Sequence, residues 1–365
     1  MRSILERIYF RDNDAVNIRV LSIEEYPWRY HQCLTIVLVL EGEVGLKLSY
    51  SHYDLVKGDV HVIHDGDVYG FEKHSPANKV LLLHVNTEEF SKEFPWVETE
   101  VFTTKLTANP SKYDELKLFR EKVLDVADAY GSNETELKLK AADMLQMLHN
   151  HFQSFLLNQE TREFYYKKSH DAMQSERISK IVSFIYENYD GKLSLGEIAE
   201  DFNLDKYYLS HLFQKYVGEN FRSFVSMVRV ELSEAQLLET EKSVTKISED
   251  VGFSDAKYYI DNFRIWFNCL PNEYRETFRM NTIIYGQTKA TEYPKESFRK
   301  VIAEYKGLIE GSDTGDEILI IREEELAVLG DILEIEVIPG AGDAAYKLKL
   351  KTDNIKGISI KAKNI

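Results

Sequence analysis

Residues 198–218 read IAEDFNLDKYYLSHLFQKYVG, and residues 247–268 read ISEDVGFSDAKYYIDNFRIWFN. The second segment repeats the first at an offset of about 49 residues. The repeated positions pair Ile198, Glu200, Asp201 and Leu204 with Ile247, Glu249, Asp250 and Phe253. A repeat of this length indicates a duplicated supersecondary element. We therefore interpret the rest of the chain outward from these two segments.

Each copy has the pattern of two short helices joined by a tight turn. In the first copy, Leu209, Leu212, Phe213 and Tyr216 recur at the spacing of one helix face. We expect Asp205 and Ser254 to cap the second helices, and Gly218 and Asn268 to end them, because these residue types suit those positions. Two helices joined in this way form a helix-turn-helix unit, for which DNA binding is favoured over a plain helical hairpin.

The second copy also matches a known signature. GFSDAKYYIDNFRIWF, followed by Pro271, Glu273, Tyr274 and Arg275, resembles the signature of AraC/XylS-type transcriptional regulators. The first copy, with Arg229 in the helix that follows, resembles the first half of the same domain. The resemblance covers residues 175–280 and implies that the second helix of each copy enters the major groove of DNA. Residues 221–240, free of Pro and Gly, would form a helical strut of ~30 Å between the copies.

In the first copy, the resemblance implies that Tyr207, Ser210 and His211 reach base edges. A serine hydroxyl can donate or accept a hydrogen bond, so Ser210 discriminates weakly between bases. We expect three basic residues to contact phosphates, which position the protein without reading sequence: Lys206, Lys215 and Arg222.

In the second copy, Lys257 and Arg264 are the predicted DNA contacts. Ala256, Ile260 and Asp261 are expected to face outward beside them, and the carboxylate of Asp261 stands where a basic residue is frequent. We therefore expect the first copy to carry more of the sequence information. For each predicted contact, the alternative is an ordinary solvated helix face.

Composition bounds the possible functions. The chain has 365 residues, enough for two or three domains, and a net charge of −16. Residues 175–280 hold 13 Lys and Arg against 18 Asp and Glu, which argues against indiscriminate binding to nucleic acid. Either the basic residues gather on one face, which we favour, or dimerisation strengthens weak contacts. Two cysteines, a charged N-terminus and the lack of a long apolar run favour a soluble cytoplasmic protein.

Residues 1–105 alternate short apolar runs with turn signals, as a β-sandwich or barrel does. The segments LEGEVGLKL, LVKGDVHVI and DGDVYGF resemble the cupin-like jelly roll that precedes the DNA-binding half in many AraC-type regulators. A jelly roll can enclose a small ligand. We predict an effector site formed by Trp28, Arg29, His31, Thr35 and Tyr69, in which Trp28 and Tyr30 could stack on a sugar ring. The alternative makes these aromatics core or dimer-interface residues.

A catalytic metal centre is disfavoured by the same positions. Catalytic cupins place two His, one Glu and a later His around a metal, and the corresponding positions here hold Arg29, His31, Thr35 and Tyr69. Only His31 remains, whereas a catalytic site normally needs three protein ligands. No metal or other cofactor is therefore predicted.

Residues 106–174 contain two amphipathic helical segments separated by a break at residues 131–133. Asn133 and Glu136 suit an N-terminal cap of the second helix. In regulators of this type, such a helical pair packs on the barrel and often forms a dimer interface. Packing without dimerisation is the alternative. Residues 159–174 are polar and are interpreted as an interdomain linker.

Residues 281–365 extend beyond the family signature. They predict a helix at residues 296–310 and about five strands, which could form a small β-rich module. No nucleophile–base pair, metal-ligand spacing or phosphate-binding loop stands out in this segment. It could also be the start of a longer domain.

The sequence thus predicts a multidomain α+β protein: a cupin-like jelly roll, a helical pair, an all-α domain with two helix-turn-helix units and a β-rich extension. We expect a non-enzymatic, sequence-specific transcriptional regulator that binds promoter DNA and a small-molecule effector, plausibly a sugar, as a homodimer. The first alternative is a regulator fused to, or truncated from, a carbohydrate-binding or glycoside-hydrolase module. The second is a metal-dependent cupin enzyme.

Overall fold

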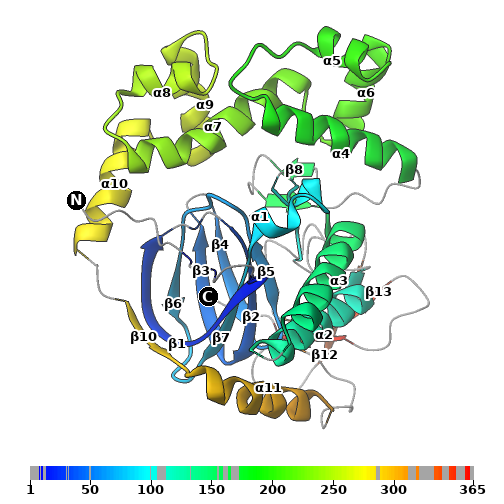
Figure 1. Cartoon of the computed structure of the whole chain (residues 1–365), viewed down its shortest axis with the longest axis vertical. Coiled ribbons are helices and arrows are strands. Elements are labelled where there is room, and N and C mark those ends of the chain that lie inside the picture. Colours follow the sequence, from blue (N-terminus) through cyan, green and yellow to red (C-terminus); the bar gives the residue numbers. More distant parts are fainter. Residues whose placement is uncertain are drawn as a thin grey trace.

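The structure is a computed structural model that describes most of residues 14–310 and four later strands. The described residues are 8, 10, 14–29, 31, 33–48, 51–98, 100–104, 112–131, 133–153, 156–158, 163–165, 172–284, 288–310, 318–319, 333–338, 345–350 and 358–361. Figure 1 shows a barrel with helices beside it and a separate helical layer above it. Within the described residues, no helix combines the length and apolar character needed to cross a membrane.

The barrel is an antiparallel sheet in the order β4-β3-β6-β1-β7-β2-β5. Its strands are β1 (Val16–Arg29), β2 (Leu34–Glu41), β3 (Glu43–Leu48), β4 (His52–Val56), β5 (Val60–Ile63), β6 (Tyr69–Lys73) and β7 (Lys79–Val85). Gly42 links β2 to β3 with φ +72°, and an added Cβ would lie 2.0 Å from the carbonyl oxygen of Ala77. The turn therefore requires glycine here. The predicted jelly-roll barrel is confirmed.

Alternation along β2 separates two cores. Leu34, Ile36 and Leu38 belong to the cluster that packs against the neighbouring helices. Val37 and Val39 belong to the barrel's own interior cluster. Because side chains alternate across a strand, Thr35 faces the interior with Val37. The inner wall therefore carries a polar position at the start of β2.

The helices beside the barrel form a second layer. They comprise α1 (Thr87–Phe90), the short 3-10 helix η1 (Pro95–Glu98), α2 (Tyr113–Ala129) and α3 (Glu134–Phe152). Asn133 caps α3 as predicted, because its side chain accepts hydrogen bonds from the backbone N–H groups of Thr135 and Glu136. The apolar faces of α2 and α3 join the outer cluster of the barrel.

The helical layer above the barrel has its own core. It contains α4 (Ala172–Glu187), α5 (Leu195–Asp201), α6 (Lys206–Tyr216), α7 (Phe221–Glu239), α8 (Val244–Asp250), α9 (Ala256–Phe267) and α10 (Pro271–Ile284). Figure 1 places the pairs α5–α6 and α8–α9 toward opposite ends of α7, on the side away from the barrel. The duplicated segments thus form two helix-turn-helix units joined by one long helix, as predicted.

After α10 the chain returns to the barrel. Strand β10 (Lys289–Glu292) pairs with β1, and α11 (Lys295–Glu310) places Phe298, Val301 and Ile302 in the outer core of the barrel. The helix expected at residues 296–310 is confirmed, but it lies against the barrel rather than within a separate module. Its apolar stripe explains this position, because the stripe covers apolar surface left by β2 and α2.

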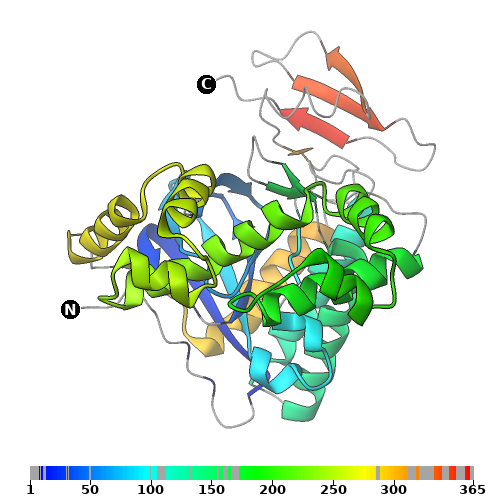
Figure 2. The same cartoon turned by 90° about the horizontal axis from the view of Figure 1, so that it is seen from above.

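The later residues form a four-stranded sheet in the order β11-β14-β13-β12. Its strands are β11 (Ile318–Leu319), β12 (Leu333–Ile338), β13 (Ala345–Leu350) and β14 (Ile358–Lys361). Figure 2 shows this sheet to one side of the other layers. One of the five strands expected in residues 281–365, at residues 326–329, lies outside the described residues. Strand β8 (Leu156–Asn158), directly before the segment interpreted as a linker, pairs with β9 (Glu163–Tyr165) within that segment.

Candidate nucleic-acid interface and barrel interior

Capping side chains fix the start of the second helix in each unit. Asp205 accepts hydrogen bonds from the backbone N–H groups of Tyr207 at 2.9 Å and Tyr208 at 3.0 Å. In the second unit, Asp255 accepts from the N–H of Lys257 at 2.8 Å. The prediction of Ser254 as this cap was wrong by one residue, because Asp255 has the extended backbone and the bonded carboxylate that a cap requires.

The ends of the same helices also match the prediction. Asn268 follows α9 in the left-handed conformation, with φ 57°. Gly218 follows α6 closely, with φ +81°. Both residues tolerate this conformation, which stops a helix and redirects the chain.

Two equivalent arginines hold the units together. The Arg229 guanidinium donates to the carbonyl oxygens of Tyr189 and Gly191, each at 2.7 Å. Arg275 donates to the carbonyl oxygens of Leu237 at 3.0 Å and Lys242 at 2.7 Å. Burial lowers the pKa of Arg229 from its usual value. These two arginines therefore bind backbone within the domain.

The predicted contacts of the first unit all lie on exposed positions. Tyr207 is 84% exposed, which leaves nearly its whole ring available to a partner. Leu209, Leu212 and Phe213 point into the core from the same helix. The other predicted residues are also exposed: Lys206, Ser210, His211, Lys215 and Arg222. The helix therefore separates a buried apolar face from a polar outer face.

The outer face of the second unit has a different composition. Lys257, Asp261 and Arg264 are exposed, and Ile265 beside them is 72% exposed. Ile260, expected to face outward, is instead partly buried against the core. This face thus combines two cations with one carboxylate and an apolar side chain.

A groove lies between the two units. Its lining includes Ser210 and Arg222 from the first unit and Ser254 and Tyr258 from the second. Two residues predicted to contact DNA therefore share one concave surface with residues of the other unit.

Three of the five predicted effector residues come together inside the barrel. The Tyr69 hydroxyl lies 2.9 Å from Nδ1 of His31 and 3.0 Å from Nε2 of the same ring. Thr35 Oγ1 lies 2.9 Å from Nδ1 of His84. The rings of His31 and His84 meet edge to face, with centroids 4.8 Å apart. All four side chains are buried, so they form one polar cluster within an apolar interior.

The other two predicted effector residues face different partners. Trp28 packs edge to face on Phe278 of α10, with ring centroids 5.0 Å apart. The Arg29 guanidinium lies 3.4 Å from the Tyr26 ring centroid and donates to Thr288 Oγ1 at 2.8 Å. Trp28 and Arg29 thus contact the helical layer and the segment that follows it. Tyr30 lies outside the described residues.

Cys33 and His84 also belong to the interior cluster and were not among the predicted effector residues. Cys33 Sγ lies 3.8 Å from Thr35 Oγ1 and 4.0 Å from His84 Nδ1. Burial raises the pKa of the Cys33 thiol to about 12. Two signals were present in the sequence: His31, Cys33 and Thr35 alternate along an extended segment, and His84 interrupts the apolar run of β7 between Leu83 and Val85.

The barrel lies close to a partly buried acid on α7 of the helical layer. Glu231 accepts a hydrogen bond from the Tyr186 hydroxyl at 2.9 Å. Burial raises the pKa of Glu231 to about 7, and the negative charge of Asp67 in the barrel acts in the same direction. Val68, next to Asp67, belongs to the core of the helical layer. Tyr69, the following residue, points into the barrel, so one short segment contacts both domains.

A second polar contact joins α3 to α4. Glu100 is almost fully buried and accepts hydrogen bonds from His149 Nδ1 at 2.6 Å and from the Ser179 hydroxyl. Gln153 donates to Ser179 Oγ at 2.8 Å. Because Ser179 lies on α4, this network attaches the first helix of the upper layer to the helical pair.

Known proteins resemble the chain mainly over the duplicated region. A family model described as a helix-turn-helix domain matches residues 198–277. The melibiose operon regulatory protein of Escherichia coli is 27% identical over 99 residues, which are 27% of this chain and 33% of that protein. The lactose operon transcription activator of Staphylococcus xylosus is 28% identical over 107 residues, which are 29% of this chain and 38% of that protein.

Other relatives are similar over more of the chain. An uncharacterized HTH-type transcriptional regulator of Staphylococcus aureus is 20% identical over 260 residues, which are 71% of this chain and 33% of that protein. The chain thus spans about a third of the length of these relatives.

Proposed function

Because the chain belongs to the AraC/XylS-type transcriptional regulators, we propose that it binds promoter DNA through α6 and α9 and changes this binding when a small molecule enters the barrel. The observation that carries the proposal is the pair of capped helices with exposed polar residues, set in the two units that lie on the side of α7 away from the barrel. In this proposal, Tyr207, Ser210 and His211 read bases, whereas Lys206, Lys215, Arg222, Lys257 and Arg264 bind phosphates or bases.

The effector would act through the segment that contacts both domains. A ligand that hydrogen-bonds to His31, Thr35 or Tyr69 would shift Tyr69 and with it Val68, which is packed in the DNA-binding domain. The shift alters DNA affinity only if the ligand binds the two arrangements with different affinities. Arg29 and Trp28 would transmit the same change at a second contact between the two domains, through Thr288 and Phe278.

A sugar or sugar derivative is the proposed effector class. Polar side chains that converge inside an apolar barrel suit a small polyhydroxylated ligand. The names of two relatives, a melibiose operon regulator and a lactose operon activator, support the same class. The proposal assigns no catalytic step to the chain.

A homodimer is proposed to form through the helical pair. Leu118 on α2 is 48% exposed and Leu139 on α3 is 67% exposed, so each offers apolar surface for burial against a second copy. Dimerisation would double the number of reading helices and compensate for the acidic balance of residues 175–280.

Fluorescence anisotropy tests the DNA-binding proposal. The wild-type chain is titrated onto DNA from upstream of its own gene with excess random competitor, over a salt series. We expect specific binding that the double variant His211→Ala/Arg264→Ala weakens by 100-fold or more, since each base contact is worth roughly 1–3 kcal/mol. The matched control is Arg299→Ala, which removes one exposed arginine from α11. Equal binding by the double variant would overturn the assignment of these helices.

A further inference from the structure

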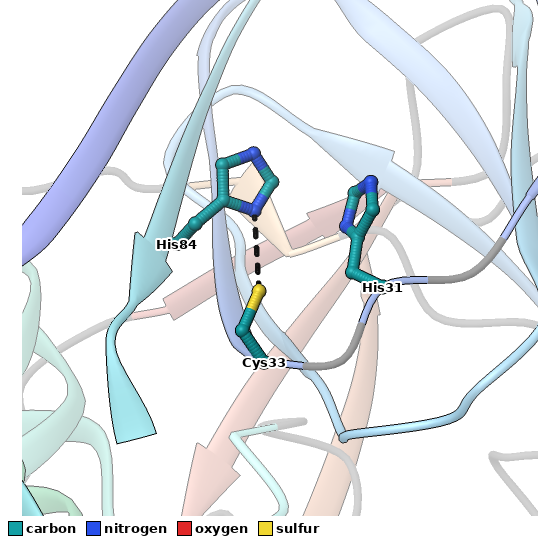
Figure 3. Close-up of side chains that lie close together, drawn as sticks. All are labelled: His31, Cys33 and His84. Atoms are coloured by element: carbon teal, nitrogen blue, oxygen red, sulfur yellow. Dashed lines mark hydrogen bonds between the residues drawn. The ribbon is translucent and has the colours of Figure 1, made fainter. Parts of the chain in front are cut away.

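The interior of the barrel holds three metal-binding groups that the proposed function does not require together. His31, Cys33 and His84 each offer one ligand atom, and these atoms all lie within 4.8 Å of one another. The three residues are 2%, 2% and 0% exposed. Figure 3 shows the Cys33 sulfur directed at the His84 ring, with the His31 ring beside them.

We propose that His31, Cys33 and His84 bind a thiophilic metal ion, Zn²⁺ or Cu⁺, inside the barrel. The proposed site does not depend on DNA binding, and it shares His31 with the proposed effector site. It shares only His31 with the four positions at which catalytic cupins hold their metal, because Arg29, Thr35 and Tyr69 occupy the other three.

Metal binding would require only small movements of the three ligand atoms. A zinc ion binds sulfur at about 2.3 Å and imidazole nitrogen at about 2.0–2.1 Å, so two ligand atoms of a tetrahedral site lie roughly 3.5 Å apart. Cys33 Sγ and His84 Nδ1 are already 4.0 Å apart. A bound ion would therefore draw the ligand atoms together by about 0.5 Å for this pair and by up to roughly 1.3 Å for the others. Side-chain rotation can supply a change of this size without moving the strands.

The strands already hold the ligands in place. Thr35 and His84 are direct partners in the β2–β7 register, so His84 faces the same interior as the side chains preceding β2. The hydroxyls of Thr35 and Tyr69 hydrogen-bond to the rings of His84 and His31. In metal sites, such outer partners orient the ligating imidazoles. The Tyr69 hydroxyl lies within 3.0 Å of both His31 nitrogens, so it can bond to the one that does not bind metal. Thr35 would give up its bond to His84 Nδ1 when that atom binds the ion.

The chemistry of the donor set selects the ion. One sulfur and two imidazole nitrogens suit Zn²⁺ and Cu⁺, whereas Mg²⁺ and Ca²⁺ prefer oxygen. A second group, His52, Asp54 and His74, lies on exposed or partly exposed surface and contains no sulfur. Metal–sulfur bonding therefore distinguishes the interior site from this surface group.

Cobalt substitution tests the site directly. The full-length chain, purified under reducing conditions and stripped of metal, is titrated with Co²⁺ as a spectroscopic stand-in for Zn²⁺. We expect one Co²⁺ per chain with thiolate-to-cobalt charge-transfer absorption. Cys33→Ser should abolish this absorption, and His84→Gln should weaken binding by more than the roughly 10–100-fold effect of losing an outer partner. The matched controls Cys269→Ser, His61→Gln and His74→Gln should retain it.

A measurement on the wild-type chain keeps the proposal testable if a variant fails to fold. X-ray absorption spectroscopy of the chain loaded separately with Zn²⁺ and with Cu⁺ should reveal one sulfur and two nitrogen neighbours for at least one ion. Competition with chelators of known affinity then ranks the two ions. A metal shell of nitrogen and oxygen alone, or absorption that follows Cys269 instead of Cys33, would overturn the proposal.

Discussion

The two helix-turn-helix units share a skeleton, meaning the same helix caps and arginine–backbone contacts, but they present different outer faces. Each unit has a serine cap on its first helix and an aspartate cap on its second. Each is also held by an arginine that binds two backbone carbonyls, Arg229 in one and Arg275 in the other. The outer faces differ: the first combines Tyr207, Ser210 and His211, whereas the second sets Asp261 between two cations.

This difference separates what folds the domain from what the domain recognises. Caps and arginine anchors satisfy backbone groups, and such groups must be satisfied in either unit whatever the target. Exposed side chains are not constrained in this way. A change in the skeleton should therefore affect both units similarly, whereas a change on the outer face should affect only the unit that carries it.

The largest expected effect is the loss of an arginine anchor. Arg229→Ala or Arg275→Ala removes two hydrogen bonds from a charged donor, and each substitution should lower the free energy of unfolding by about 3 kcal/mol. Urea denaturation measures the loss. Arg264→Ala, on an exposed face, is the control and should change stability by less than about 0.5 kcal/mol. Strongly unequal losses from the two anchors would break the equivalence of the skeletons.

The units should also differ in how pH affects their contact with the barrel. Glu231 bonds to Tyr186 of α4, the helix that precedes the first unit, and faces Asp67 and His64 of the barrel. Trp28 of the barrel instead packs on Phe278 of α10, the helix that follows the second unit. The pKa of Glu231 is raised from 4.5 to about 7 in the folded chain. Between these values the folded chain holds a proton that the unfolded chain releases. Stability should therefore fall as pH rises through this range, by on the order of 2 kcal/mol.

Urea denaturation at pH 5 and pH 8 measures this effect. Glu231→Gln should reduce the difference in the free energy of unfolding between pH 5 and pH 8. Glu239→Gln, at an exposed position on the same helix, should leave this difference unchanged. As pH rises, the rate of amide hydrogen exchange should increase in α4 and α7 at a lower pH than in α10. A pH profile unaltered by Glu231→Gln would contradict the role of this acid.

A smaller effect should distinguish the outer faces on DNA. His211→Ala should weaken binding about tenfold and reduce the preference for one base, as expected for a base contact worth roughly 1–3 kcal/mol. Lys257→Ala should weaken binding to all sequences alike and reduce the slope of affinity against salt by about one. Anisotropy with a set of single-base operator variants measures both. The reverse pattern would assign the sequence information to the second unit.

The sequence predicted the skeleton better than it predicted the barrel interior. Helix caps and apolar spacing are local, so α6 and α9 were found to within a residue, apart from the cap at Asp255. The interior cluster depends on which strands pair: His84 meets Thr35 only because β7 lies beside β2. Trp28 and Arg29 are consecutive residues of β1, so alternation would turn only one of them inward. Their partners come from residues 278 and 288, far along the chain. Strand pairing and domain packing supply this information.

The smallest predicted effect concerns Asp261 alone. Its carboxylate is exposed on the outer face of α9, where DNA phosphates would repel it. Asp261→Asn keeps the shape of the side chain and removes the charge, so affinity should rise about threefold, or roughly 0.6 kcal/mol. The matched control is Glu200→Gln on α5, an exposed acid away from the reading faces. If Asp261→Asn instead weakens binding at operators with one particular cytosine, the carboxylate accepts from the cytosine amino group. The second unit would then read sequence through the residue that most distinguishes it from the first.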